Sequence, residues 1–157
     1  MVNLILMNHL LLVLTVVAAS LALSAMQGKP WKRFLNLDGK KPPGYTHVVT
    51  SPPGRMVFIS GQGGNDASGK MPEDFASQAK NTFENIGRCL KLADARFEDI
   101  VKINYYVTDM ANTAELRRIR AGYLNMENPP AATLVQAGLG KGLLLEVEAV
   151  AIVAEGK

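Results

Sequence analysis

Two glutamates in the last apolar segment are the residues of this sequence best suited to acid–base chemistry. Glu146 and Glu148 lie within residues 143–154 and share a parity, so an extended strand directs both to one face. Charges in the middle of a strand need partners or water, because burial penalises the ionised form. Two interpretations stay open. The face is solvated or pairs with Lys or Arg, or a partly buried carboxylate at a subunit interface holds water or accepts a proton.

A glycine-rich segment offers a second candidate site. Residues 64–70 match the spacing G-x-x-x-x-G-K of a phosphate-binding loop and lie between a predicted strand and a predicted helix. The following residues argue against that chemistry. Met71 supplies no hydroxyl for magnesium, and Pro72 lacks a backbone donor. The acidic pair 73–74 would repel an anion, so we interpret the segment as a glycine-rich connector.

Few other side chains are suited to catalysis or metal binding. The single cysteine, Cys89, lies in the second half of a predicted helix, where the helix dipole does not favour a thiolate. We interpret it as a core or boundary residue. The histidines are His9 and His47, and no loop clusters acidic residues. We therefore predict no metal site.

The elements that position Glu146 follow the order β, β, helix, β, helix, β, β. Apolar residues recur at helical spacing over 75–93, and an Asn112–Glu115 capping box begins a second helix that Pro129 and Pro130 stop. The predicted strands are 45–50, 56–60, 100–107, 132–137 and 143–154. This order predicts an α+β layer with both helices on one face of a sheet. The last strand is apolar on both parities apart from its glutamates, so we expect its open face to pack against other subunits.

Composition limits the partners and the number of domains. The chain has 157 residues and 48% hydrophobic content, which fits one compact domain with a core. The net charge of +3 is mild, and the basic residues do not alternate with aromatic ones. We therefore expect no nucleic-acid partner.

Residues 1–25 contain no Lys, Arg, Asp or Glu and include a long apolar run. Three interpretations stay open. The segment is a signal peptide cleaved after Ala22 or Ala25, and the protein is periplasmic or secreted. It is an uncleaved membrane anchor, with the basic residues that follow it keeping the domain in the cytoplasm. Or Met26 is the true start of a cytoplasmic protein. The N-terminal sequence of the purified native protein distinguishes the three.

Five segments occur in series along the chain: GYTHVV, MVFISGQ, the stretch from Phe75 to Met110, PPAATLVQAG and LLLEVEAVAI. Together they resemble the RidA (YjgF) family of reactive-intermediate deaminases. The resemblance covers about residues 33–154. It implies a chorismate-mutase-like mixed sheet with two helices on one face, and a homotrimer whose sheets form a central barrel. On this basis, residues 45–157 are a RidA-like domain that follows an extended lead-in arm, residues 26–44.

The resemblance also implies a ligand cleft between subunits and the residues that line it. Tyr45 matches the family's cleft tyrosine. Ser60 and Gly61 match a serine-glycine pair whose backbone lines the cleft. Glu146 matches the residue that positions the attacking water. The implied reaction is hydrolysis of small enamines and imines, such as 2-aminoacrylate, to 2-keto acids and ammonia, with no cofactor.

One position departs from the active family members. They read P-A-R-[ST] where this chain has Pro-Ala-Ala132-Thr133. Their arginine binds the substrate carboxylate through a two-pronged hydrogen bond, which Ala132 cannot form. The sequence therefore resembles the arginine-lacking branches of the family. Arg120, on the helix before the two prolines with Arg117 and Arg118, is the candidate replacement, and the alternative is a solvated basic face.

Two functions are consistent with these observations. The first is a hydrolase of the imine or enamine deaminase type that acts on small reactive metabolites, with Ala132 and Thr133 among its substrate-binding residues. The second is a non-catalytic trimer that binds a small molecule in the same intersubunit cleft. In both, we expect a small-molecule ligand, and a membrane contact only if the N-terminal segment is uncleaved.

Overall fold

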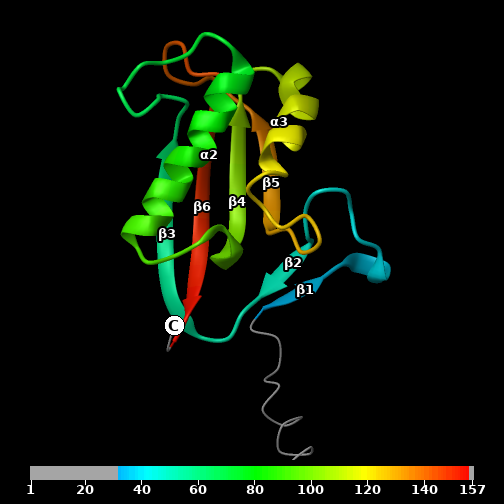
Figure 1. Ribbon diagram of the computed structural model, residues 1–157. Coiled ribbons are helices and arrows are strands. Elements are labelled where there is room, and N and C mark those ends of the chain that lie inside the picture. The colour runs from blue at the N-terminus through cyan, green and yellow to red at the C-terminus, as the bar shows by residue number, and fades with distance from the viewer. Residues whose placement is uncertain (1–31, 156–157) are drawn as a thin grey trace, which may run out of the picture. The chain divides into compact units, whose positions relative to one another are not determined.

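A four-stranded mixed sheet, covered on one face by two α-helices, forms the centre of the molecule (Figure 1). The computed structural model describes residues 32–155. The strand order is β3-β6-β4-β5, in which β3–β6 and β6–β4 are antiparallel and β4–β5 is parallel. The strands are β3 (Gly54–Gln62), β4 (Ile100–Val107), β5 (Ala131–Gln136) and β6 (Leu145–Ala154), and the helices are α2 (Phe75–Leu92) and α3 (Thr113–Arg120). The predicted α+β fold is confirmed.

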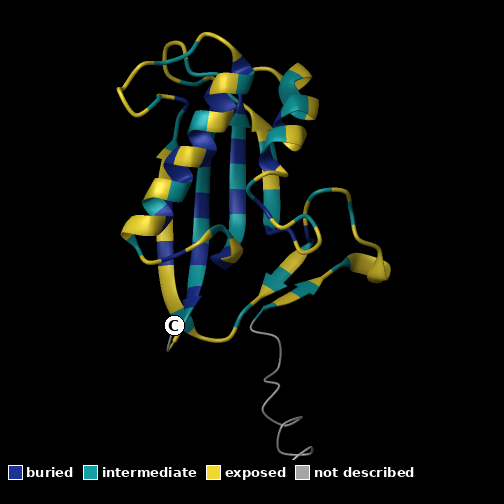
Figure 2. Ribbon diagram, viewed as in Figure 1, coloured by how far each residue is buried: buried dark blue, intermediate teal, exposed yellow. Residues whose placement is uncertain are grey.

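Strand β6 separates the core from the open face of the sheet. Its odd-numbered side chains from Leu145 to Val153 are buried, whereas its even-numbered ones are half-buried (Figure 2). The buried side packs against the apolar face of α2, where Phe75, Ala79, Phe83, Ile86 and Leu90 are buried, and Ala93, at the end of the predicted apolar spacing, is half-buried. Half-buried Cys89 packs against this core, as its interpretation as a boundary residue requires.

The segment before the domain contains a strand of its own. Within the predicted lead-in arm, β1 (Arg33–Leu35) pairs antiparallel with β2 (Val48–Thr50), and a 3-10 turn, η1 (Leu37–Gly39), lies between them. Buried Thr46 fixes the next segment to the start of β5. Its N–H donates to the Pro130 carbonyl (3.2 Å), and its hydroxyl donates to the Pro129 carbonyl (2.7 Å). These bonds hold the neighbouring Tyr45 beside β5.

Helix α3 begins directly after Asn112, the predicted cap residue, but lacks the predicted capping box and ends earlier than predicted. The Asn112 side chain accepts no hydrogen bond from the first backbone N–H groups of α3, so the capping-box prediction is wrong. The reason is the preceding 3-10 turn, η3 (Met110–Asn112), which already holds Asn112 in helical conformation. The helix also ends at Arg120 rather than at the two prolines. The chain then turns, and Tyr123 stacks on Phe83 of α2 with ring centroids 4.9 Å apart.

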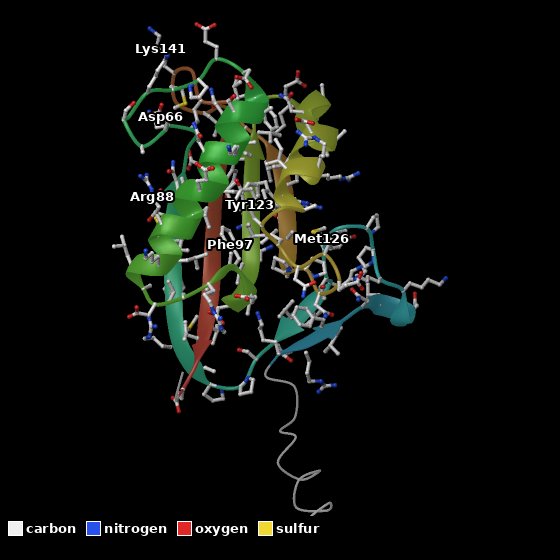
Figure 3. The ribbon with its side chains drawn as sticks, in the orientation of Figure 1. Asp66, Arg88, Phe97, Tyr123, Met126 and Lys141 are labelled. Atoms are coloured by element: carbon white, nitrogen blue, oxygen red, sulfur yellow. The ribbon has the colours of Figure 1, made fainter. Side chains whose placement is uncertain are left out.

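A further 3-10 turn, η2 (Phe97–Asp99), leads into β4. Its Phe97 ring lies 5.6 Å from the ring of Tyr123, and Figure 3 shows these two aromatic side chains between α2 and the loops that surround it. No helix within residues 32–155 is long and apolar enough to cross a membrane. The signal-peptide, anchor and Met26-start interpretations concern residues that lie outside the described range.

Gln78 joins α2 to the loops that lead into the helix and into β6. Its side chain is fully buried. The side-chain amide donates to the carbonyls of Pro72 (2.7 Å) and Gly142 (2.8 Å), and its oxygen accepts from the N–H of Leu144 (2.8 Å). One residue therefore satisfies three backbone groups that would otherwise lack partners.

We predict that Gln78→Ala lowers the free energy of unfolding by about 3 kcal/mol, because each unsatisfied buried group costs about 1–3 kcal/mol. Urea unfolding measures the change. The control is Gln136→Ala, which truncates an exposed glutamine and should change stability by less than about 0.5 kcal/mol. Equal stability of Gln78→Ala and wild type would contradict this role for the hydrogen bonds.

Candidate functional site

The predicted site residues form two groups on opposite faces of the sheet. Ala132 pairs with Ile103, which is buried on the helix-covered face. Glu146 pairs with Tyr106, which lies on the open face. Within one chain, therefore, Ala132 and Glu146 do not face each other across a single cleft.

On the open face, Glu146 lies against the backbone of Gly61. A Cβ added at Gly61 would be 2.0 Å from Glu146 Oε1 and 2.7 Å from its Cδ, so a side chain at Gly61 would displace the Glu146 carboxylate from this position. The β3–β6 register shifts between Ile59 and Gln62. Ser60 and Gly61 thus occupy a bulge, which frees their backbone from regular strand pairing.

Exposed Ser60 also lines a cavity of about 310 Å³ with Glu148 and Asn104. Within residues 32–155, Glu146 forms no hydrogen bond or ion pair, but Glu148 does. Glu148 Oε1 accepts from Asn104 Nδ2 (2.8 Å) and from the Tyr106 hydroxyl (2.9 Å). These hydrogen bonds lower the pKa of Glu148, and the bond to Glu148 raises the pKa of Tyr106. Of the two glutamates, Glu146 is therefore the one whose carboxylate has no hydrogen-bond partner in the described part of the chain.

On the helix-covered side, Tyr45, Ala132, Thr133 and Arg120 all line one cavity of about 170 Å³. The Thr133 hydroxyl accepts a hydrogen bond from Lys102, so the Thr133 side chain points to the open face although the residue borders this cavity. Tyr45 is 37% exposed, and its ring packs edge-on against His47 with centroids 5.4 Å apart.

The three arginines of α3 have different environments. Arg118 is exposed and pairs with Glu115 (2.6 Å), which is the solvated arrangement. Arg117 and Arg120 line the cavity. The Arg120 guanidinium carbon lies 5.5 Å from the ring centroid of Tyr105. The structure thus brings two of the three candidate cations to Ala132.

Three residues at these sites were not predicted from the sequence: Asn104, Tyr105 and Tyr106. Strand parity indicates which face a side chain occupies, but the cross-strand partner depends on register, which a single sequence does not fix. Asn104 is the direct partner of Glu148 in β6. The hydrogen-bond partners of Glu148 are thus a neutral amide and a phenol, and Lys102 on the same face acts on its carboxylate through charge alone.

The glycine-rich segment binds its own carboxylate. Asp66 Oδ1 accepts from the N–H groups of Ser68 (2.9 Å) and Lys70 (3.0 Å) and from the Ser68 hydroxyl (2.7 Å). Figure 3 shows Asp66 in the loop between β3 and α2. These bonds lower the pKa of Asp66 and occupy donors that a phosphate would use. The interpretation as a connector agrees with this geometry. Residues 32–155 contain no group of three or more His, Cys, Asp or Glu side chains able to hold a metal ion.

Comparison with known proteins identifies the family. The sequence model of the family described as Endoribonuclease L-PSP matches residues 40–153. The chain belongs to this family. The predicted RidA/YjgF membership is thereby confirmed, since proteins carrying the RidA and YjgF names are among the relatives.

The relatives of this RidA-family chain include enzymes that act on imines. Bovine 2-iminobutanoate/2-iminopropanoate deaminase is 35% identical over 100 residues, which cover 62% of this chain and 73% of the bovine protein. RidA from an Antarctic Psychrobacter superposes with a TM-score of 0.61 at 34% identity, covering 69% of this chain and 88% of its own. A Rid-family protein of unknown function from Yersinia pestis gives a TM-score of 0.65 at 28% identity, covering 78% and 99%.

We predict that Tyr106→Phe raises the pKa of Glu148 toward its ordinary value, because the substitution removes one of the two hydrogen bonds to the ionised carboxylate. Carbon-13 NMR of the side-chain carboxyl follows the titration. Tyr123→Phe, on the helix side of the sheet, is the matched control and should leave the titration unchanged. An unchanged Glu148 titration in Tyr106→Phe would show that the phenol does not stabilise the carboxylate.

The lowered pKa of Glu148 also determines how its hydrogen bond from Tyr106 contributes to stability at different pH values. The folded-state pKa of Glu148 lies below its unfolded value, so the unfolded chain takes up the proton first as pH falls. The stabilisation is therefore present above the unfolded pKa and is lost as pH falls through the folded pKa. Tyr106→Phe should make unfolding less dependent on pH in this acidic range.

Proposed function

We propose that this RidA-family protein hydrolyses small imines and enamines, with Glu146 orienting and deprotonating the attacking water. The observation that carries the proposal is the Glu146 carboxylate, which lies on Gly61 without a partner among residues 32–155. Its neighbour Glu148 is engaged by Asn104 and Tyr106. The relatives named 2-iminobutanoate/2-iminopropanoate deaminase supply the reaction class.

The proposed reaction requires acid–base chemistry alone. Water adds to the imine carbon and forms a C–O bond, its proton passes to Glu146, and the C=N electrons move to nitrogen, which takes up a proton. The hydroxyl proton of the resulting carbinolamine then passes to its nitrogen by way of Glu146, the C–N bond breaks to release ammonia, and the carbonyl product remains. An enamine first takes up a proton on carbon and gives up one from nitrogen, which converts it to the imine.

We further propose that the protein acts as a homotrimer with the complete site between subunits. Two observations support this assembly. The Tyr45–Ala132 cavity and Glu146 lie on opposite faces of one sheet, so a second copy is needed to bring the two groups together. The open side of β3 also exposes large apolar side chains, Met56 (55%) and Phe58 (73%), which a neighbouring sheet would cover.

We predict that the purified protein accelerates the decay of 2-iminobutanoate generated in situ, and that Glu146→Gln lowers this rate by about a hundredfold or more, the usual contribution of a positioned acid–base group. Release of ammonia and absorbance of the imine follow the reaction. Glu148→Gln is the matched comparison. It removes the same charge from the same strand face and should reduce the rate much less.

Equal losses in the two variants would contradict the assignment of Glu146. Saturable binding of a small molecule without any turnover would instead support the second function, a non-catalytic trimer that binds a small molecule. The expectation that the chain has no nucleic-acid partner stays a prediction. Incubation with RNA tests it directly, since the family description names an endoribonuclease.

A further inference from the structure

Arg120 is a buried cation with no anion beside it. Its side chain is only 8% exposed, and none of the ion pairs within residues 32–155 includes it. The cavity that it lines contains a second arginine and no aspartate or glutamate: Pro43, Tyr45, Tyr105, Thr113, Leu116, Arg117, Ala132, Thr133 and Leu134 complete the lining. A buried charge without a partner is costly, so this cavity favours an anion from outside the described residues.

Two hydrogen-bond groups in the cavity lining also lack partners. The Nε of Arg120 and the hydroxyl of Tyr105 are both buried and form no hydrogen bond within the described part of the chain. Burial raises the pKa of Tyr105 to about 12, although the charge of Arg120 and a contact of its guanidinium with the phenol oxygen, outside hydrogen-bond geometry, oppose the shift. The phenol is therefore protonated and can donate at neutral pH. Unsatisfied donors of this kind are rare in native structures and indicate a ligand or ordered water.

Two small residues, Gly44 and Ala132, lie beside the space that the Arg120 guanidinium occupies. Gly44 has φ +84°, and a Cβ added there would lie 2.0 Å from Arg120 Nη2. Ala132 borders the same cavity from β5. The cavity volume of about 170 Å³ limits the ligand to a few heavy atoms.

We propose that this cavity binds the carboxylate of a small organic acid, with Arg120 as the principal cation and the Tyr105 hydroxyl as a second donor. In this proposal α3 supplies the cation of the site through Arg120, because β5 has the uncharged Ala132 at the position that borders the cavity. The chemical class follows from the fork of guanidinium donors, which matches the two oxygens of a carboxylate. The choice of a 2-keto or 2-imino acid as the ligand rests on the proposed function.

Calorimetric titration of the full-length protein with 2-oxobutanoate tests the proposal. This compound is the product expected from 2-iminobutanoate, and the uncharged ketone butanone serves as the comparison ligand. We expect saturable binding of 2-oxobutanoate that weakens with added salt, and none of butanone. Arg120→Met should weaken binding about ten- to a hundredfold, as expected for loss of a charge-assisted hydrogen bond.

The matched control is Arg118→Met, which removes the same charge from the same helix at an exposed position paired with Glu115. It should bind within about twofold of wild type, since surface pairs contribute little. A second pair of variants keeps Arg120 in place in case its removal impairs folding. Ala132→Glu supplies an internal carboxylate and should abolish 2-oxobutanoate binding, whereas Ala132→Gln, of nearly the same size, should retain more of it.

Three outcomes would overturn the inference: no saturable binding by wild type, equal binding by Arg120→Met and Arg118→Met, or equal binding by Ala132→Glu and Ala132→Gln. Failure of the proposed function looks different. In that case 2-oxobutanoate binds in an Arg120-dependent manner, but 2-iminobutanoate is not hydrolysed. Conversely, hydrolysis that survives intact in Arg120→Met would leave the proposed function standing and exclude Arg120 as the carboxylate-binding group.

Discussion

The alternation of β6 between a buried and an open face is the constraint on which the rest of the site depends. Its odd-numbered side chains pack under α2, which requires Glu146 and Glu148 to lie on the other side of the sheet. Residues that pair across neighbouring strands lie on the same face of the sheet. The pairing of β6 with β4, and of β4 with β5, therefore makes Tyr105 and Ala132 face the helices. Acid and cation are thus kept apart within one chain, and each is available on its own face of the sheet.

The elements that depend on local periodicity were predictable from the sequence. Strand β4 has its predicted bounds, and α2 differs from its prediction by one residue at its end. The start of α3 after Asn112 was predicted, but its early end and its missing capping box were not, because they depend on the preceding 3-10 turn and on the stacking of Tyr123 on Phe83. The residue pattern of a capping box, Asn112 followed three residues later by Glu115, does not reveal the backbone conformation that the 3-10 turn imposes on Asn112.

The site was predictable in its residue types and less so in its geometry. Parity correctly placed both glutamates on one face, but the difference between them comes from cross-strand register, which puts Asn104 opposite Glu148 and a bulge at Gly61. Similarly, the sequence pointed to three arginines on one helix. Only the position of α3 in the folded domain distinguishes Arg118, which is solvated, from Arg120, which is buried.

The position of β6 in the chain has a consequence for how the molecule assembles. Strand β6, which joins β3 to β4, comes after both of them in the chain, and its partner β3 begins about ninety residues earlier. During synthesis, the apolar faces of α2, β3 and β4 stay uncovered by β6 until residues 145–154 have left the ribosome. A chain interrupted before that point lacks β6 and leaves the apolar side chains that β6 covers exposed, and exposed apolar surface of this kind promotes aggregation.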